Sequence, residues 1–378
     1  MLSGSQTPDF SLVEVSLGDR SYRIEIGTKS IETFCQSILS ALDDLSHAMV
    51  IADEAVESHW AMPIASSIAM AKTESGDEVR VNLMSVPSGE TSKSIEQVDK
   101  LWQWMLESSC DRRSAVIAIG GGVIGDLAGF AAATFTRGIR FVQVPTTLLA
   151  MVDSSVGGKT GINLPTAKNM VGAFWQPSLV CIDTAILSTL SDRDFRSGLG
   201  EVVKYGVIDD VEFFMWLEEN ASALADRDDD AVRYAVAKSC ESKASVVGED
   251  ERETSGRRAI LNYGHTFAHA IEATAGYGNI LHGEAVAIGM QMAANLAIEL
   301  KLCEPDLLDR QTKLLKACGL PTTFAAADPE AMLPVMRRDK KVSHGNLRFV
   351  LPERIGSVML LGDIQESGVV NAIQACTT

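Results

Sequence analysis

The sequence lacks clustered cysteines. Its seven cysteines are scattered along 378 residues, their number is odd, and no CxxC motif occurs. Disulfide frameworks and cysteine-zinc sites both depend on several cysteines at defined spacings, so this distribution argues against either of them. We therefore expect reduced thiols and a cytoplasmic location.

Long hydrophobic runs are also missing. The longest uncharged stretches contain about 14 residues, with glycine, proline or glutamine among them, whereas a membrane-spanning helix needs about 20 apolar residues. The opening residues, MLSGSQTPDF, show neither the basic region nor the apolar region of a secretory signal. These absences predict a protein that is not secreted and has no membrane partner.

Positive charge is scarce, since 33 Lys and Arg residues stand against 50 Asp and Glu residues and give a formal net charge of −17. Such a field repels a phosphate backbone, which argues against a nucleic-acid partner. A small anionic substrate is compatible with this charge only if Lys and Arg residues gather locally around it.

The chain is long enough for two domains with real cores, because 46% of its 378 residues are hydrophobic. In the first half, short β-rich segments alternate with helical patterns such as 94–107. The expected strands are 11–17, 22–26, 48–52, 79–86, 115–119, 141–144 and 179–182. This alternation predicts a parallel sheet with helices on both faces.

The character of the sequence changes near residues 185–190. Helical spacing dominates beyond this point, at 211–221, 228–247, 258–275, 283–300 and 307–318. Only 347–351 and 358–361 resemble strands there. We therefore predict an α/β N-terminal Rossmann-like dinucleotide-binding domain (1–187) and a mostly α-helical C-terminal domain (188–378) that binds metal and substrate.

A glycine-rich turn follows the apolar strand expected at 115–119. Residues 120–126 read GGGVIGD and open a helix of small residues. Glycines at such a turn let backbone N–H groups approach a pyrophosphate, and the helix N-terminus favours its charge. The motif is not GxGxxG, so a simple tight turn is the alternative. Asp53, after an earlier strand, is placed to bind ribose hydroxyls.

Further polar side chains follow the ends of other predicted strands. They supply hydroxyls, carboxylates and lysines, namely Glu90, Lys93, Thr146, Thr147, Asp153 and Lys159. The segment 157–160, GGKT, resembles a P-loop, but position 153 is Asp instead of the first glycine, which excludes an NTPase. With Arg137, Lys168 and Asn169, these groups indicate a pocket for a phosphorylated anion. Solvated loop lysines are the alternative.

Three of the six histidines, His265, His269 and His282, fall within eighteen residues. The first two are four residues apart and would share one face of a helix. His282 precedes the apolar segment 285–298, which we expect to be a buried helix that fixes the histidine at its start. Such a group suits a divalent metal, with Zn²⁺ the first choice. Solvated or core histidines are the alternative.

A carboxylate is available to complete this site. Glu201 lies in GLGEVVKYG, at the start of an otherwise apolar helix, where an uncompensated buried carboxylate would be costly. Either a metal or Lys204, one turn later, would compensate its charge. Together with His265 and His282, Glu201 forms a His₂Glu set, which is a known class of zinc ligands.

A series of longer motifs occurs in order between roughly residues 88 and 351. They are GGGVIGDLAGFAAATFTRG, VPTTLLAMVDSSVGGKTGIN, KNMVGAFWQP, GLGEVVKYG, LNYGHTFAHAIE, LHGEAVAIGM and RDKK. Each alone is weakly specific, but together they closely resemble the 3-dehydroquinate synthase family. The resemblance covers most of the chain, and the region before residue 45 contributes no motif to it.

The resemblance implies a homodimeric enzyme that uses NAD and zinc or cobalt. It implies the metal ligands Glu201, His265 and His282, and it makes His269 an active-site residue instead of a ligand. The implied NAD contacts are Asp53, Glu90, Lys93, Gly121, Gly122, Asp126, Thr146, Thr147, Lys159, Lys168 and Thr189. The implied substrate contacts are Arg137, Asp153, Lys159, Asn169, Lys204, Lys243, Arg258, Asn262, His269 and Lys341. Arg137 is expected to reach across the dimer interface.

The family reaction is the second step of the shikimate pathway. It converts 3-deoxy-D-arabino-heptulosonate 7-phosphate into 3-dehydroquinate and phosphate by transient oxidation at C5, β-elimination of phosphate, reduction, ring opening and an aldol closure. The alternatives are a related cyclase acting on sedoheptulose 7-phosphate, a metal-dependent polyol dehydrogenase and a catalytically inactive scaffold. The many expected cations argue against the dehydrogenase, and the complete ligand set argues against the scaffold.

Overall fold

The computed structural model describes residues 10–73, 76–165, 167–276, 278–338 and 347–377. The chain divides into unit 1, Met1–Leu190, and unit 2, Ser191–Thr378. The division lies three residues from the boundary expected at 187/188. Each unit has its own core and is described by itself.

Unit 1 is built on a seven-stranded sheet in the order β1-β2-β9-β6-β5-β3-β4. Its strands are β1 (Ser11–Val15), β2 (Tyr22–Gly27), β3 (His47–Asp53), β4 (Arg80–Val86), β5 (Ser114–Gly120), β6 (Arg140–Pro145) and β9 (Leu179–Asp183). β1 runs antiparallel to β2, and the other neighbours are parallel. The predicted strands are therefore confirmed, with small differences at their ends.

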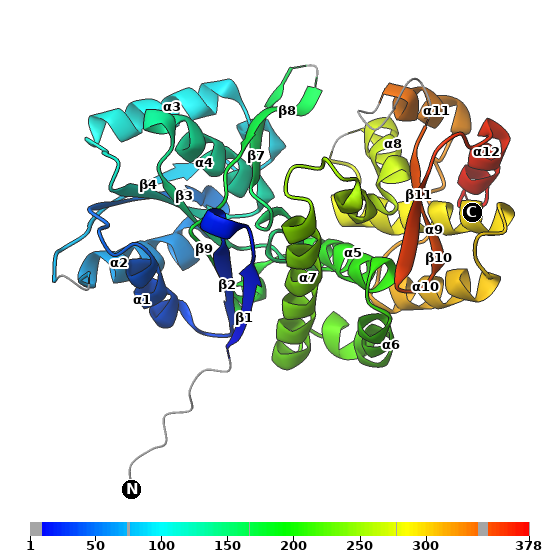
Figure 1. The fold of residues 1–378 in the computed structure, drawn as a ribbon, viewed down its shortest axis with the longest axis horizontal. Coiled ribbons are helices and arrows are strands. Elements are labelled where there is room, and N and C mark those ends of the chain that lie inside the picture. Colours follow the sequence, from blue (N-terminus) through cyan, green and yellow to red (C-terminus); the bar gives the residue numbers. More distant parts are fainter. Residues whose placement is uncertain (1–9, 74–75, 166, 277, 339–346, 378) are drawn as a thin grey trace, which may run out of the picture. The chain divides into compact units, whose positions relative to one another are not determined.

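Helices cover both faces of this sheet (Figure 1). α3 (Ile95–Glu107) and α4 (Gly122–Thr134) lie on one face, and α1 (Ile31–Ala41) and α2 (Met62–Met70) lie on the other. β5 is buried along its whole length, which explains its continuous apolar sequence, SAVIAIG. Short helical turns complete the unit: η1 (Gly18–Arg20), η2 (Glu54–Val56), η3 (Glu57–Ala61), η4 (Glu90–Ser92), η5 (Phe135–Arg137), η6 (Ala150–Ser154) and η7 (Thr184–Thr189).

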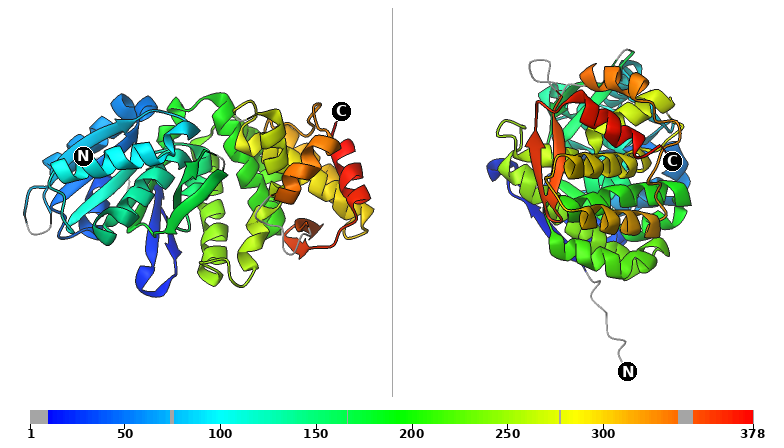
Figure 2. Two further views of the ribbon diagram at one scale, coloured as in Figure 1. Left: turned by 90° about the horizontal axis from the view of Figure 1, so that it is seen from above. Right: turned by 90° about the vertical axis from the view of Figure 1, so that its right-hand side faces the viewer.

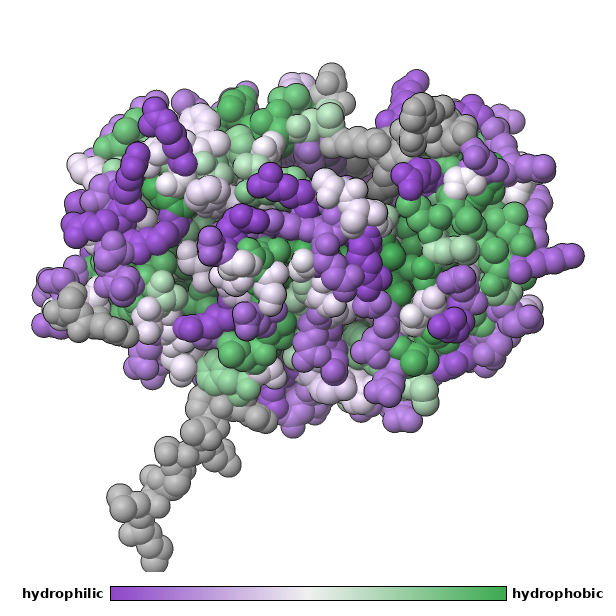
Figure 3. Space-filling model, in the orientation of Figure 1, coloured by the Kyte–Doolittle hydropathy of each residue, from purple (hydrophilic) through white to green (hydrophobic). Residues whose placement is uncertain are grey.

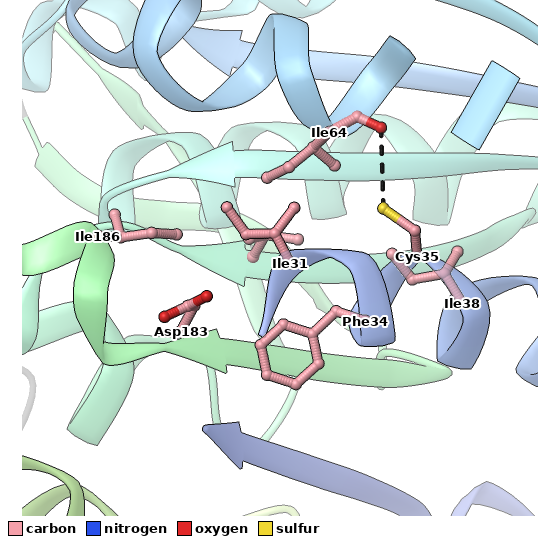
Figure 4. A pocket seen from close by; sticks show the side chains of 8 residues that line it. Ile31, Phe34, Cys35, Ile38, Ile64, Asp183 and Ile186 are labelled. Atoms are coloured by element: carbon pink, nitrogen blue, oxygen red, sulfur yellow. Dashed lines mark hydrogen bonds between the residues drawn. The ribbon is translucent and has the colours of Figure 1, made fainter. Parts of the chain in front are cut away.

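A narrow apolar cavity lies between α1 and the sheet (Figure 4). Ile31, Phe34 and Cys35 line it, and the Cys35 thiol points to the carbonyl oxygen of Ile64 at 3.9 Å. The carboxylate in its wall belongs to Asp183, which accepts hydrogen bonds from the backbone N–H groups of residues 29 and 30. This carboxylate therefore serves to join β9 to the start of α1.

A hairpin of β7 (Lys159–Leu164) and β8 (Ala167–Phe174) forms a second, two-stranded sheet in unit 1. No strand was predicted from the sequence in this segment. β7 packs on α4, where a Cβ on Gly129 would lie 2.4 Å from Thr160 Cγ2. The hairpin therefore depends on a close approach that only glycine permits.

Unit 2 is mainly helical. Its helices are α5 (Asp192–Ile208), α6 (Val211–Ala225), α7 (Asp229–Glu249), η8 (Arg257–Asn262), α8 (His265–Ala275), α9 (His282–Glu299), α10 (Pro305–Ala317), α11 (Pro329–Arg338) and α12 (Glu366–Gln374). The buried helix α9 contacts α5, α8, α10 and α12, as the yellow helix in Figure 2 illustrates. The predicted fold class is confirmed by this helical unit and the Rossmann-like sheet.

Two local predictions were wrong. The segment 258–275 is not one helix, because Gly264 takes a left-handed φ of 78° and separates the 3₁₀ helix η8 from α8. Glu201 does not stand at a helix start either, since α5 begins at Asp192. The sequence reading also missed α11 and α12.

The hairpin of β10 (Phe349–Arg354) and β11 (Ser357–Leu361) packs against α9. β11 is half-buried throughout, and the hydropathy surface shows apolar side chains over this region among charged surroundings (Figure 3). Within the described residues, no helix combines the length and the apolar character that crossing a bilayer requires.

Candidate active site

Three side chains of unit 2 converge on one point. The carboxylate of Glu201 is fully buried on α5, and its Oε1 lies 3.6 Å from His265 Nε2 and 3.5 Å from His282 Nε2. One potential ligand atom from each residue lies within 4.8 Å of the others. The three predicted metal ligands are thus brought together from α5, α8 and α9.

Close backbone contact between α5 and α9 sets two of these positions. A Cβ on Gly283 would lie 1.7 Å from the carbonyl oxygen of Ser197, and one on Gly200 would lie 2.5 Å from the carbonyl oxygen of Gly283. The Gly283 N–H also donates to Ser197 Oγ at 3.0 Å. Because Glu201 and His282 are the neighbours of these glycines, the contact places their side chains side by side.

His265 reaches the cluster through a second glycine contact. Gly264 packs against α9, where a Cβ on Gly289 would lie 2.2 Å from the carbonyl oxygen of Gly264. The left-handed turn at Gly264 makes His265 the first residue of α8. The His265 Nδ1 lies 3.1 Å from the carbonyl oxygen of Tyr263, so Nε2 faces Glu201.

The start of α9 is held by a carboxylate and a guanidinium. Glu284 Oε2 accepts the backbone N–H of Leu281 at 2.8 Å. Arg193 on α5 donates to both carboxylate oxygens of Glu284, at 2.8 Å each, and to the carbonyl oxygen of Asn279 at 3.0 Å. This two-pronged ion pair fixes the residue at which α9 begins, and therefore His282.

Two carboxylates, those of Glu201 and Glu272, contact His282 and favour positive charge there, although Lys204 also pairs with Glu201. Burial lowers the pKa of His282, but its contacts with Glu201 and Glu272 outweigh burial and raise that pKa to about 10. The same charge that favours a proton on His282 favours a divalent cation among the three side chains. Two imidazoles and one carboxylate are the donor set of many catalytic zinc sites, so the residues fit such a metal.

His269 is the third histidine of the motif, one helical turn after His265. Its ring centroid lies 5.7 Å from that of His265, and His269 is not a member of the three-residue cluster. The geometry therefore does not favour His265 and His269 as a pair of metal ligands, which their spacing alone suggested.

Unit 2 also holds three buried cations on elements that pack on one another. Lys204 is 1% exposed, Lys243 5% and Arg258 3%, and their elements α5, α7 and η8 pack on one another. Lys204 forms an ion pair with Glu201. Asn262 ends η8. Lys341 lies outside the described residues. An acidic protein needs a local group of cations to bind an anionic substrate, and unit 2 has such buried cations.

A single carboxylate shapes the loop that carries Arg258. Asp250 accepts four backbone N–H groups, those of residues 254, 255, 256 and 258, at 2.8 to 3.2 Å. The Arg258 guanidinium is oriented by the carbonyl oxygen of Glu251 at 2.7 Å and by Glu253 at 3.7 Å. The sequence reading did not find Asp250.

The glycine turn of unit 1 has the structure expected of a phosphate-binding turn. Gly121 is the N-cap of α4, directly after β5. A Cβ on Gly121 would lie 3.2 Å from Thr147 Cγ2, and one on Gly122 would lie 2.9 Å from Ser154 Oγ. Thr146 donates its N–H to the carbonyl oxygen of Gly120 at 3.0 Å. The turn therefore presents a helix N-terminus that has no obstructing side chains of its own.

Lys93 joins several predicted contacts beside this turn. Its ammonium donates to Asp126 Oδ2 at 2.6 Å and to Asn169 Oδ1 at 2.5 Å. Burial raises the pKa of Asp126, and the charge of Lys93 opposes this rise. Asn163, which the sequence reading missed, donates its amide to Glu90 Oε1 at 2.7 Å. The structure thus links Glu90, Lys93, Asp126 and Asn169 in one network.

The remaining candidates of unit 1 are more dispersed. Asp53 ends β3 and accepts the Ala55 N–H at 3.0 Å, and the Ser88 hydroxyl also donates to it. Thr189 accepts the indole N–H of Trp60 at 2.9 Å. Lys159 and Lys168 are exposed on β7 and β8, Asp153 lies in η6, and Arg137 is exposed in η5.

Comparison with known proteins decides the family. The family model for the 3-dehydroquinate synthase N-terminal region matches residues 83–197, and that for the C-terminal region matches residues 198–342. The 3-dehydroquinate synthase of Rhodopirellula baltica is 61% identical over 98% of both chains. That of a Bradyrhizobium species is 44% identical over 99% of this chain and 98% of its own. The chain belongs to the 3-dehydroquinate synthase family.

Solved structures of other cyclases are similar to this family member. A 2-deoxy-scyllo-inosose synthase, solved with carbaglucose-6-phosphate, NAD⁺ and Co²⁺, superimposes with a TM-score of 0.86 at 27% identity over 97% of this chain and 100% of that one. A 2-epi-5-epi-valiolone synthase from Streptomyces hygroscopicus, solved with NAD⁺ and Zn²⁺, gives 0.84 at 28% identity over 96% and 98%. A glycerol dehydrogenase from Schizosaccharomyces pombe, at 18% identity over 93% and 87% with a TM-score of 0.65, shares the fold alone.

Proposed function

We propose that the chain is a 3-dehydroquinate synthase, converting 3-deoxy-D-arabino-heptulosonate 7-phosphate into 3-dehydroquinate and phosphate. The observation that carries the proposal is the Glu201, His265 and His282 cluster, with buried cations in the same unit, in a chain of this family. A metal-dependent lyase acting on an anionic sugar phosphate needs both features. The reaction is a step of chorismate and aromatic amino acid biosynthesis.

Zn²⁺ or Co²⁺ is the metal that we assign to the cluster. Glu201 offers a buried carboxylate, and His265 and His282 each present Nε2 to it. Such a metal supplies Lewis acidity toward substrate oxygens. The protein's part is to hold the three donors in place, and the glycine contacts of α5, α8 and α9 do so.

NAD is the second cofactor, and we assign it to the carboxyl edge of the unit 1 sheet. The N-terminus of α4 would bind the pyrophosphate through backbone N–H groups, while Asp53, Glu90 and Lys93 stand at the ends of neighbouring strands. NAD bound there supplies a hydride acceptor that is regenerated within each turnover.

Lys204, Lys243 and Arg258 are assigned to the anionic groups of the substrate. Lys204 already pairs with Glu201 and Arg258 with Glu253, so the substrate's anionic groups would share these cations with protein carboxylates. Three buried cations in one unit still favour an anionic ligand over a neutral polyol. His269, on the same helix as His265, is assigned to the substrate site as well.

We further propose a cytoplasmic homodimer in which Arg137 serves the partner's substrate site. Arg137 is exposed and has a left-handed φ of 70°, and Gly138 after it packs against the Trp175 ring. This geometry supports an arginine that projects away from its own fold. The exposed apolar residues Met170 and Phe174 on β8 are suited to burial by a second subunit.

The function is tested with purified protein, the heptulosonate phosphate and NAD far below the substrate concentration. Inorganic phosphate should be released over many turnovers per NAD, with no steady accumulation of NADH. Chelation should abolish this release, and Zn²⁺ or Co²⁺ should restore it. Stoichiometric NADH formation would instead favour the dehydrogenase, and full activity in a demonstrably metal-free sample would contradict the metal assignment.

A further inference from the structure

Glu272 extends the histidine face of α8. It follows His265 by seven residues and His269 by three, so the three side chains lie on one side of the helix. Glu272 is not one of the three clustered ligands, and its side chain is 19% exposed. A carboxylate in this position is close to the cluster without belonging to it.

Glu272 contacts the ring nitrogen of His282 that is not directed at Glu201. Its Oε1 lies 3.2 Å from His282 Nδ1, while His282 Nε2 lies 3.5 Å from Glu201 Oε1. An N–H at Nδ1 that donates to Glu272 leaves the lone pair of a neutral imidazole on Nε2. The contact thus selects the tautomer and the ring orientation that a metal requires.

The two imidazoles of the cluster are oriented by different means. His265 Nδ1 faces the backbone carbonyl of Tyr263 at 3.1 Å, and its side chain is 12% exposed. His282 is 28% exposed and relies on a side-chain carboxylate. Because water has more access to His282, its orientation depends more on an added partner.

We propose that Glu272 is a positioning residue of the metal centre, holding His282 in the tautomer and orientation that bind the metal. The inference rests on the proposed metal-dependent function. Carboxylates behind ligating histidines orient the ring, raise its basicity and, when removed, typically weaken metal affinity about 10- to 100-fold.

The test measures zinc affinity by competition with a chromophoric chelator in the full-length protein. Glu272→Ala should bind Zn²⁺ about 10- to 100-fold more weakly. Glu272→Gln keeps an acceptor but loses the charge, so its affinity should fall between those of Glu272→Ala and the wild type. Glu212→Ala removes an exposed glutamate of α6 and should match the wild type. The visible spectrum of the Co²⁺-loaded protein should change in Glu272→Ala and not in Glu212→Ala.

The melting temperature of the metal-free protein shows whether Glu272→Ala weakens metal binding directly or only by destabilising the fold. Without metal, Glu272→Ala should still unfold cooperatively, at a temperature lowered only by the loss of the Glu272–His282 contact, and its zinc affinity should be reduced even at temperatures where both proteins are fully folded. Wild-type zinc affinity and an unchanged Co²⁺ spectrum in Glu272→Ala would overturn the inference while leaving the proposed function intact. If His282→Ala also kept wild-type affinity, the metal centre itself would be misplaced, and both proposals would fall.

Discussion

Glycine at position 283 determines how closely α5 and α9 approach. We predict that Gly283→Ala destabilises the fold and weakens metal binding, because the added methyl would lie 1.7 Å from the carbonyl oxygen of Ser197. Relieving that overlap requires backbone movement, and overpacking of this kind typically costs about 1–3 kcal/mol or more. Denaturant unfolding and zinc titration measure the two effects.

Gly362→Ala is the matched control for this substitution. A Cβ at Gly362 would approach no described atom closer than 3.8 Å, and its φ is not in the left-handed region. This variant should retain the stability and zinc affinity of the wild type. Equal behaviour of the two variants would show that the α5–α9 contact does not set the geometry of the site.

The candidate metal ligands could be predicted from the sequence, but the residues that hold them in place could not. Histidine spacing and an acidic residue in an apolar helix pointed to the residues that cluster, and the motif resemblance separated His269 from His265. Glu272, Arg193 and Asp250 were missed, because each acts through a partner that is distant in sequence or through several backbone N–H groups. Their roles follow from folded geometry alone.

The loop from residue 250 to residue 258 is an element organised by one side chain. Burial raises the pKa of Asp250, but hydrogen bonds from the N–H groups of residues 255, 258 and 254 outweigh it and hold the pKa well below its usual range. A depressed carboxyl pKa contributes stability above the unfolded-state value of about 3.9 and loses it as the pH falls further.

We therefore predict that Asp250→Asn melts at a lower temperature than the wild type at pH 7. The difference should shrink as the pH is lowered below about 4, where the wild-type carboxylate begins to lose its contribution. Because Arg258 N–H is one of the donors, KM should rise as well. Asp309→Asn, an exposed residue on α10, should melt like the wild type. A difference that is constant with pH would rule out the ionised carboxylate as the cause.

Element types were predicted well where periodicity was strong and poorly where one glycine or a short exposed strand decided the structure. The buried strands β3, β5 and β6 were found because their runs are apolar and bounded by turns. The β7–β8 hairpin was missed because a glycine interrupts each strand and because β8 is exposed along most of its length without alternating polar and apolar residues. Gly264 interrupts an apolar helical pattern and ends the expected helix. One α-helix over this segment would place Arg258 and Asn262 on the same face, but in the 3₁₀ helix η8 residues four apart lie roughly 120° apart around the axis.

Mixing of inactive subunits tests whether two subunits of the proposed dimer share a substrate site. If Arg137 serves the partner's site, mixed dimers of Arg137→Ala and His282→Ala contain one site with both groups intact. After random exchange of equal amounts, about a quarter of wild-type activity should return, since half of the dimers are mixed and each has one working site. A mixture of Glu201→Ala with His282→Ala should recover nothing, because both residues serve the same subunit's site. If no activity returns after subunit exchange has been demonstrated, Arg137 does not serve the partner's site: it acts in the site of its own subunit or has no part in the reaction.

Substrate choice is the property that distinguishes this enzyme from related cyclases. Sedoheptulose 7-phosphate lacks the C1 carboxylate of the heptulosonate phosphate. Arg258 is 3% exposed and offers a fixed guanidinium, the group that binds carboxylates through two parallel hydrogen bonds. An analogue without the carboxylate forgoes these two hydrogen bonds and leaves Arg258 with only its contacts to Glu251 and Glu253, so we expect it to be processed far less well.

We therefore predict turnover of the heptulosonate phosphate and little or none of sedoheptulose 7-phosphate. Arg258→Ala should mostly lower kcat/KM for the carboxylate substrate and narrow the gap between the two. Arg257→Ala is the neighbouring control, since Arg257 pairs with Asp209 and Glu249 and should leave the ratio of the two kcat/KM values unchanged. Phosphate release from both sugars with each variant measures these ratios. Equal processing of both sugars by the wild type would mean that the reaction is not dehydroquinate synthesis, even with the metal centre and the dinucleotide site correctly assigned.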